Sequence, residues 1–332
     1  MAFWSFCPLV SEDIEHVNNY MKKSVVSRKQ TLTNISQDLI DSGGKRLRSG
    51  FLILAAHLGE YNRDDILPFA AAVELIHTAT LVHDDIIDES SYRRNNQTIH
   101  EKWGRDMAIY TGDYLFTKSF AMLSDKDVPE NNYLNKVAHA MQSICEGEID
   151  QYEQKYKIQN VYDYLKRIHR KSAVLFALSS GVGAQQAGCS NKIIRHASTF
   201  ALHYGVAFQI YDDLLDYTDT ELNIGKPIGN DIKEGNYTLP IIYALEDPTY
   251  GDSIQNLLLK KDAITDAEIQ TVIQYVNKTD AINQSTKLAF KFLYKAESRL
   301  NRLPNKPCVP YFRQILYDLF PSYPELKHTI KL

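Results

Sequence analysis

Residues 81–88 read Leu81-Val82-His83-Asp84-Asp85-Ile86-Ile87-Asp88, and residues 208–216 read Phe208-Gln209-Ile210-Tyr211-Asp212-Asp213-Leu214-Leu215-Asp216. Each stretch ends an apolar run that predicts a helix. Residues three and four apart share a helix face, so Asp84 and Asp88 point the same way with Asp85 beside them. Like charges on one face destabilise a helix by roughly a few tenths of a kcal/mol per pair. Two such clusters therefore predict bound cations, and oxygen ligands suit Mg²⁺ that bridges to substrate phosphates.

Neither a solvated surface patch nor a calcium loop accounts for both clusters. A solvated polar patch would explain one cluster, but not a second of identical spacing. An EF-hand loop is excluded, because neither cluster has the Gly and the distal Glu that the loop requires. The chain also has no GxxxxGK[ST] and no GxGxxG, so nucleotide-binding loops lack support.

Composition favours a helical fold. The 332 residues are enough for one large domain or two modest ones. Gly and Pro are sparse, at 15 and 11, which disfavours a turn-rich all-β protein. No Pro/Ser-rich linker marks a boundary, so we expect one all-α domain over residues 1–332, with its motifs between about 43 and 240.

Net charge and cysteine spacing limit the partners and the cellular compartment that we expect for this protein. The net charge of −4 argues against nucleic acid as a partner. Cys7, Cys145, Cys189 and Cys308 form no CxxC, which predicts free thiols of a cytoplasmic protein. Residues 1–8 are apolar but lack the basic region of a signal peptide. No apolar run approaches the length of a transmembrane helix, so a lipid product would leave from a soluble or membrane-peripheral enzyme.

Helical spacing recurs along the chain, without convincing alternating strands. We expect helices over residues 11–41, 64–88, 105–124, 131–156, 160–180 and 190–217, followed by shorter ones. Pro68 is expected in the first turn of its helix. Polar loops are expected at residues 89–96 and 223–231. The two Asp-rich helices would form facing walls of one cavity.

Basic residues near these helices are candidates for holding phosphate. Lys45, Arg46 and Arg48 follow the pair Gly43-Gly44, which combines flexible backbone N–H groups with cations suited to diphosphate. The further candidates are Arg93, Arg94, Lys171, Ser172, Lys226 and His77. Any one of these cations could be a solvated surface charge, and a lone helix histidine is usually structural. His77 lies seven residues before Asp84, on roughly the same helix face.

The order of motifs from Gly43 to Pro240 resembles the trans-polyprenyl diphosphate synthases, the polyprenyl synthetases of the isoprenoid synthase type I fold. The motifs are GGKRLR, ELIH, LVHDDIID, Arg-Arg, GDYL, Lys-Ser, FQIYDDLLD, GKPIGND and GNYTLP. The segments 101–103, 109–113, 146–148 and 278–282 are similar to component II of the two-component heptaprenyl diphosphate synthases. The resemblance implies a bundle of long antiparallel helices around a central cavity.

The resemblance also implies the roles of matching positions. About three Mg²⁺ ions per active site would be held by Asp84, Asp85, Asp88, Asp212, Asp213 and Asp216. The allylic diphosphate would be contacted by Arg93, Lys171, Ser172, Gln209 and Lys226, and isopentenyl diphosphate by Lys45, Arg48, His77 and Arg94. The residues acting directly in catalysis would be Asp84, Asp85, Asp88, Arg93, Lys171 and Lys226. The family pattern has Pro, Gly and Thr where this chain has Ser49, Asn95 and Ser172.

The implied reaction is chain elongation. The alkene of isopentenyl diphosphate would attack an allylic cation formed from farnesyl diphosphate, and the released diphosphate would take the proton. The growing tail would pass Thr80, Ala79 and Ile76, with Phe116 and Phe120 as floor candidates. One helical turn rises about 5.4 Å, close to one isoprene unit, and small residues here leave the tunnel open past about C20, to about C30–C40 with C35 favoured.

Partners and alternatives also follow from the resemblance. The chain would form a homodimer through residues 105–124, or a heteromer with a small non-homologous component I, and the product would serve the menaquinone side chain. A class I terpene cyclase typically lacks the second DDxxD and the GGKRxR site. A non-catalytic regulatory subunit would have lost Asp-cluster residues that this chain keeps.

Overall fold

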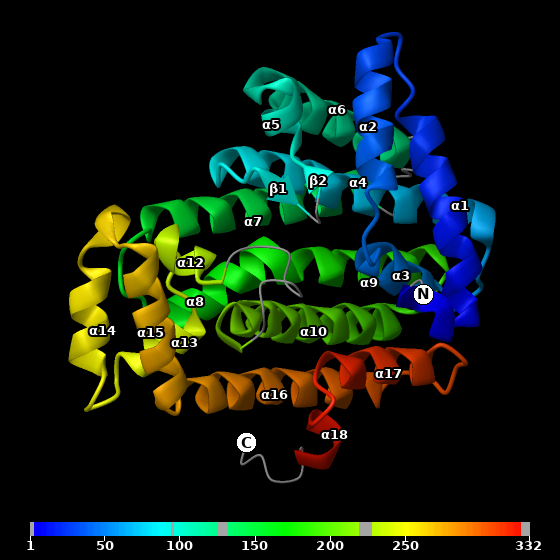
Figure 1. Ribbon diagram of the computed structural model, residues 1–332. Coiled ribbons are helices and arrows are strands. Elements are labelled where there is room, and N and C mark those ends of the chain that lie inside the picture. The colour runs from blue at the N-terminus through cyan, green and yellow to red at the C-terminus, as the bar shows by residue number, and fades with distance from the viewer. Residues whose placement is uncertain (1–2, 94–95, 125–131, 219–227, 327–332) are drawn as a thin grey trace. The chain divides into compact units, whose positions relative to one another are not determined.

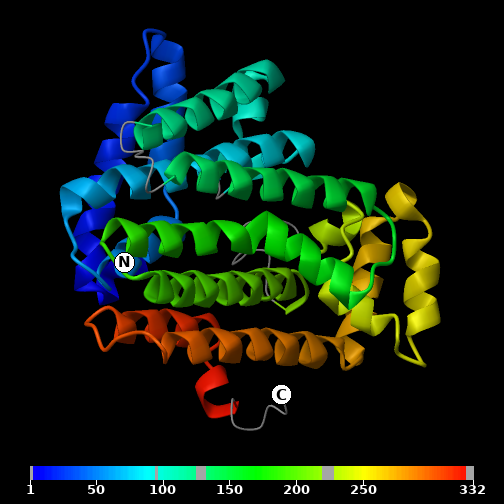
Figure 2. The same cartoon turned by 180° about the vertical axis from the view of Figure 1, so that it is seen from behind.

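The computed structural model describes residues 3–93, 96–124, 132–218 and 228–326 (Figures 1 and 2). Over these residues the chain is helical, apart from one short two-stranded hairpin, so the all-α prediction is confirmed. The chain divides into two compact units. Unit 1 comprises Met1–Ala140, Leu175–Ala201 and Arg299–Gln314, and unit 2 comprises Met141–Val174, Leu202–Ser298 and Ile315–Leu332. The expectation of a single domain remains a prediction.

Unit 1 is built around the long helix α4 (Arg63–Ile87), which packs against α6 (Arg105–Ser124), α1 (Pro8–Ser24) and α3 (Leu47–Ala56). Figure 1 shows α6 running beside α4. Residues 66–76 of α4 are buried on every side, as expected for a helix in a core. The Asn62 side chain accepts a hydrogen bond from the Asp64 N–H, which caps the first turn.

The helical spacing over residues 11–41 corresponds to two helices, α1 and α2 (Gln30–Asp41). Between them the Ser27 N–H donates to Thr33 Oγ1, and this side-chain contact replaces helical hydrogen bonds with a turn. Pro68 lies inside α4 and not in its first turn, because Asn62 caps the helix earlier than the sequence indicated.

A hairpin occupies part of the predicted polar loop. Strands β1 (Tyr92–Arg93) and β2 (Asn96–Gln97) are antiparallel, with Tyr92 opposite Gln97. The helix α5 (Ile99–Trp103) follows, with Thr98 as its N-cap. This hairpin was not predicted, because two residues per strand are too few to show an alternating pattern.

The core of unit 1 includes a cluster of aromatic rings. Phe51 of α3 has its ring centroid 5.2 Å from Phe176, 6.0 Å from Phe200 and 5.7 Å from Phe312. These four residues are fully buried and come from three separate segments of the unit. The cluster therefore fixes α3, and the basic segment before it, against the rest of unit 1.

Unit 2 has its own core. Buried residues of α12 (Asn230–Lys233), α13 (Leu239–Ala244), α14 (Gly251–Leu258) and α15 (Asp266–Lys278) pack together with Tyr217. A capping box of Thr265 and Glu268 starts α15. The remaining helical elements are η1 (Phe3–Phe6), α7 (Tyr133–Glu153), α8 (Val161–Ile168), η2 (His169–Ala173), α9 (Val174–Gln186), α10 (Asn191–Thr218), η3 (Lys261–Ala263), α16 (Ala281–Leu300), α17 (Val309–Leu319) and α18 (Tyr323–Leu326).

Two further expectations concern cysteines and membranes. The four cysteines are free, as predicted. Among the described helices, α4 alone is long and apolar enough to cross a membrane by length and composition, and 72% of its most apolar window is buried inside the protein. A buried core helix passes the same test, so this is weak evidence for a membrane span.

Candidate active site

The first Asp cluster lies at the C-terminal end of α4. Asp84 and Asp85 are in the last turn, and Asp88 is the C-cap residue. The C-terminal end of a helix carries partial negative charge, which disfavours carboxylates, and no basic residue lies in this last turn. Asp84 and Asp88 are not fully buried. Carboxylates at this location are therefore favoured by an added cation.

Asp85 is held by an arginine of the hairpin. Arg93 Nε lies 2.6 Å from Asp85 Oδ1, and Asp85 is only 7% exposed. Burial raises the pKa of Asp85, although the charge and the hydrogen bond of Arg93 oppose this. The hairpin thus places Arg93, a predicted diphosphate ligand, at the Asp cluster.

The second Asp cluster is embedded in a hydrogen-bond chain within unit 2. Asp213 accepts hydrogen bonds from Tyr164 Oη at 2.7 Å and from Gln209 Nε2 at 2.8 Å. Ser172 Oγ donates to Gln209 Oε1 at 2.6 Å. Burial, followed by the nearby charge of Asp231, raises the pKa of Asp213 to about 7. Three predicted site residues, Ser172, Gln209 and Asp213, are therefore joined by hydrogen bonds, together with Tyr164, which the sequence did not indicate.

The other members of this cluster differ in exposure. Asp212 is exposed, whereas Asp216 is fully buried and accepts from the Asp231 N–H at 3.3 Å. Lys171 Nζ lies 2.9 Å from Glu148 Oε2. Lys171 and Ser172 belong to the π-helical turn η2, and such turns often occur at functional sites.

The segment Gly43–Arg48 joins α2 to α3. Gly43, Gly44 and Arg46 have φ values of 75°, 140° and 48°, so the backbone turns sharply in the left-handed region. Lys45 is exposed, and its carbonyl accepts a hydrogen bond from Trp4 Nε1 at 2.7 Å. The Arg48 guanidinium lies over the Phe176 ring, 4.7 Å from the centroid.

A cavity of about 390 Å³ lies beside this segment in unit 1. Its walls include His77, Thr78 and Asp85 of α4, Arg93 of the hairpin and Gly43. The cavity therefore brings a predicted ligand of isopentenyl diphosphate, His77, together with the Asp85–Arg93 pair. It is also lined by apolar residues of α2 and α4, which suits an alkyl group beside a charged one.

The residues predicted to control chain length do not line this cavity. Ile76 and Ala79 are fully buried in α4, and Thr80 Oγ1 donates to the His77 carbonyl at 2.8 Å. The Phe116 and Phe120 rings on α6 are stacked, with centroids 6.5 Å apart. The tunnel along these residues remains a prediction.

Several predicted site residues are not brought together here. Arg94, Asn95 and Lys226 lie outside the described residues. The first Asp cluster is in unit 1 and the second is in unit 2. The arrangement of the two Asp-rich helices as facing walls of one cavity therefore remains a prediction.

The donor set fits a hard divalent cation. Within the described residues, no three Asp, Glu, His or Cys side chains converge into a ready-made metal site. Mg²⁺ commonly keeps several waters and binds through one or two carboxylates plus substrate phosphates, so it does not need such a cage. Asp84, Asp88 and the exposed Asp212 supply oxygens of this kind.

Comparison with known proteins identifies the class. The polyprenyl synthetase family model matches residues 29–276. The component 2 of heptaprenyl diphosphate synthase from Geobacillus stearothermophilus is 39% identical over 91% of this chain and 92% of its own length. The chain therefore belongs to the polyprenyl synthetase family, and it is a prenyltransferase of the trans-polyprenyl diphosphate synthase type.

Solved structures of prenyl diphosphate synthases are similar to this chain over most of its length. Heptaprenyl diphosphate synthase from Staphylococcus aureus superposes with a TM-score of 0.87 at 31% identity, covering 93% of this chain and 96% of that one. Polyprenyl synthase from Caulobacter crescentus, crystallised with calcium and isoprenyl diphosphate, has a TM-score of 0.87 at 30% identity, covering 94% and 95%. The family is one of Mg²⁺-dependent prenyltransferases.

Some residues around the site were not predicted from the sequence. Glu74 is buried beside the Gly43–Arg48 segment, and Trp4 anchors Lys45. The sequence did contain a sign of the role of Glu74, because a carboxylate within an apolar helix needs a partner when it is buried. The roles of Trp4 and Tyr164 depend on contacts between distant segments, which no local pattern reveals.

Proposed function

We propose that this enzyme adds isopentenyl diphosphate units to farnesyl diphosphate and releases an all-trans polyprenyl diphosphate of about C30–C40, with C35 favoured by the tunnel spacing. The observation that carries the proposal is the pairing of two DDxxD clusters with a GGKRLR segment in one chain. The 39% identity to a component 2 of heptaprenyl diphosphate synthase supports the length. The small residues Ala79 and Thr80 on α4 support it further.

The Asp clusters would hold the metal. In this proposal Asp84, Asp85, Asp88, Asp212, Asp213 and Asp216 bind about three Mg²⁺ ions with the allylic diphosphate. When bound, Mg²⁺ neutralises negative charge that develops on the leaving diphosphate. Arg93 orients Asp85 and adds a guanidinium to the same leaving group. The bond between C1 and the diphosphate oxygen breaks, and an allylic cation forms.

The basic residues would divide between the two substrates. Arg93, Lys171, Ser172, Gln209 and Lys226 hold the allylic diphosphate. Lys45, Arg48, His77 and Arg94 hold isopentenyl diphosphate so that its alkene faces C1. The new carbon–carbon bond forms there, and the proton lost from the adduct passes to the released diphosphate. Apolar walls keep water from the cation.

The proposal includes partners and location. Ile109 and Tyr110 on α6 are 40% and 66% exposed, which suits a subunit interface in a homodimer. The relative from Geobacillus is named as a component 2, which supports a second subunit, and we propose that this subunit is small and non-homologous. We place the enzyme in the cytoplasm, at the membrane surface where a long-chain product leaves, and assign the product to the menaquinone side chain.

The test is product analysis with matched variants. The purified chain, with and without a co-expressed component 1 of a heptaprenyl diphosphate synthase, is given farnesyl diphosphate, radiolabelled isopentenyl diphosphate and Mg²⁺. We expect long-chain product with the partner, and little without it. Asp84→Asn should lower turnover by at least about a hundredfold, the loss expected when a group that stabilises transition-state charge is removed. The control Asp252→Asn, on the exposed surface of α14, should retain full turnover.

The outcomes are separable. Near-wild-type turnover of Asp84→Asn would contradict the metal site. Full long-chain synthesis by the chain alone would instead indicate a homodimeric synthase. Cyclic products, with no use of isopentenyl diphosphate, would contradict chain elongation altogether.

A further inference from the structure

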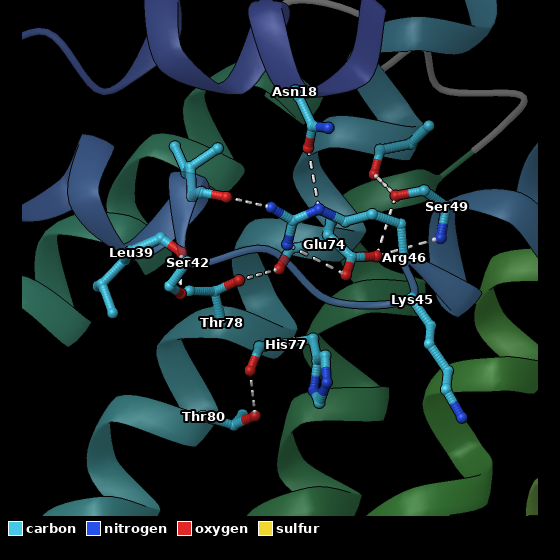
Figure 3. A network of polar contacts seen from close by, with 12 residues as sticks. Asn18, Leu39, Ser42, Lys45, Arg46, Ser49, Glu74, His77, Thr78 and Thr80 are labelled. Carbon is cyan, nitrogen blue, oxygen red and sulfur yellow. Dashed lines mark hydrogen bonds and ion pairs between the residues drawn. The ribbon is translucent and has the colours of Figure 1, made fainter. Parts of the chain in front are cut away.

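Glu74 is a buried carboxylate that the proposed reaction does not use. It lies on α4 one turn before His77 and is 4% exposed. Its Oε1 is 3.7 Å from Arg46 Nη1. Its Oε2 accepts from the Ser49 N–H at 3.3 Å and lies 3.0 Å from Ser49 Oγ (Figure 3). A buried carboxylate with this set of partners is costly to disturb, because removing one partner leaves the others unsatisfied.

The contacts with Ser49 place Glu74 at the N-terminus of α3. The first N–H groups of a helix have no acceptor within it. Arg46 is the N-cap residue of α3, and its side chain makes no capping hydrogen bond. Ser49 is the third residue of the helix, where a local cap would usually bind. Glu74 supplies this acceptor from another helix, and its charge is favoured at the positive end of α3.

Arg46 fixes the other side of the segment. Its Nε donates to Asn18 Oδ1 at 2.9 Å, and its Nη2 donates to the Ile40 carbonyl at 2.5 Å. Arg46 is 5% exposed, and although it lines the cavity, its guanidinium is held by these protein groups. Lys45 directly precedes Arg46, and Arg48 lies between Arg46 and Ser49. Both proposed ligands of isopentenyl diphosphate are therefore close in sequence to residues that are held in place by the network.

The same helix carries another proposed ligand. His77 follows Glu74 by three residues, so both lie on one face of α4. In Figure 3 the side chains of Lys45 and His77 extend from the network in the same direction. One helix thus carries both Glu74, which contacts the basic segment, and His77, a proposed ligand of the same substrate.

We propose that Glu74 is a positioning residue for isopentenyl diphosphate. Through Ser49 and Arg46 it sets the position of Lys45 and Arg48 relative to His77. The identity of the ligand rests on the proposed function. Proline at position 49 would remove the N–H that donates to Glu74 and the hydroxyl, which lies 3.0 Å from Glu74 Oε2 and 2.9 Å from the Ala70 carbonyl oxygen.

Binding of isopentenyl diphosphate to metal-free protein, measured by calorimetry, tests the inference without turnover. Omitting metal and allylic substrate isolates the basic site. Glu74→Gln should raise the Kd about tenfold, the equivalent of one hydrogen bond to a charged group. Ser49→Ala keeps the N–H and should raise it by a smaller factor. Ser49→Pro should raise it about as much as Glu74→Gln.

A matched control separates positioning from stability. Asp13 is also 4% exposed and pairs with Arg63 and Tyr61, away from the basic segment. Asp13→Asn should destabilise the protein as Glu74→Gln does, yet leave the Kd within about twofold of wild type. In steady-state assays Glu74→Gln should raise the KM for isopentenyl diphosphate and leave the KM for the allylic substrate unchanged.

The double variant Glu74→Gln/Ser49→Pro gives the decisive comparison. Because Ser49→Pro already removes the contacts between Ser49 and Glu74, Glu74→Gln should raise the Kd by a smaller factor in the Ser49→Pro background than in the wild type, and the two effects are then less than additive. Additive effects on the Kd would overturn the positioning role of Glu74 but not the proposed function. Wild-type affinity in both Glu74→Gln and Ser49→Ala would do the same. A wild type that binds isopentenyl diphosphate but does not condense it overturns the proposed function alone.

Discussion

Replacing Gly50 with alanine tests how the N-terminal aromatic residues support the basic segment. Gly50 lies on α3, where an added Cβ would overlap the six-membered ring of Trp4. Trp4 is 2% exposed, and its indole N–H donates to the Lys45 carbonyl at 2.7 Å. The indole must therefore move in Gly50→Ala, and this hydrogen bond is lost or weakened.

The expected loss of stability can be worked from these contacts. Forcing a methyl group into a packed core costs about 1–3 kcal/mol. Loss of the indole hydrogen bond adds about 1 kcal/mol. Alanine gains about 1 kcal/mol over glycine within a helix. The net effect on the free energy of unfolding is a loss of roughly 1–3 kcal/mol.

Urea unfolding followed by circular dichroism measures this loss of stability. The same substitution is also made in a Trp4→Phe background for comparison. The smaller ring leaves room for a Cβ, so Gly50→Ala should cost less in the Trp4→Phe background. Because the Lys45 carbonyl loses its anchor, the KM for isopentenyl diphosphate should also rise. A Gly50→Ala variant as stable as wild type, or one that costs the same in both backgrounds, would refute the reasoning.

Three further outcomes are expected. Burial raises the pKa of Asp213 in the folded protein to about 7, whereas the pKa of an unfolded Asp is about 4. The free energy of unfolding of the metal-free protein should therefore fall as the pH rises from the lower value to the higher one. Urea titrations at several pH values measure this slope, and Asp213→Asn should flatten it. Ala79→Phe should shorten the product to about C15–C20 with condensation retained, because one turn of α4 matches about one isoprene unit; unchanged product length by mass spectrometry would show that the tail runs elsewhere. EDTA should abolish turnover and Mg²⁺ should restore it, whereas activity that persists in EDTA would contradict the role given to Asp84.

Local sequence pattern was enough to predict the helical class and to propose residues for the candidate site. Apolar spacing of 3.6 residues is a property of neighbouring residues, so it placed α4, α6 and α10 close to their observed bounds. The Asp clusters were found in the same way, since their spacing is itself the signal. The break between α1 and α2 was missed, because one contact from Ser27 to Thr33 decides it.

Sequence alone indicated the family and predicted the chemical type of the site, because metal ligands and phosphate ligands appear as residue types at fixed local spacings. The resemblance named Lys45 and Arg48 as ligands, but no local pattern gave the reason why Arg46 should differ from its neighbours. The structure buries Arg46 against Glu74, Asn18 and the Ile40 carbonyl, and leaves Lys45 exposed. Only tertiary packing decides this, since the desolvation of a charge depends on partners that come from distant helices.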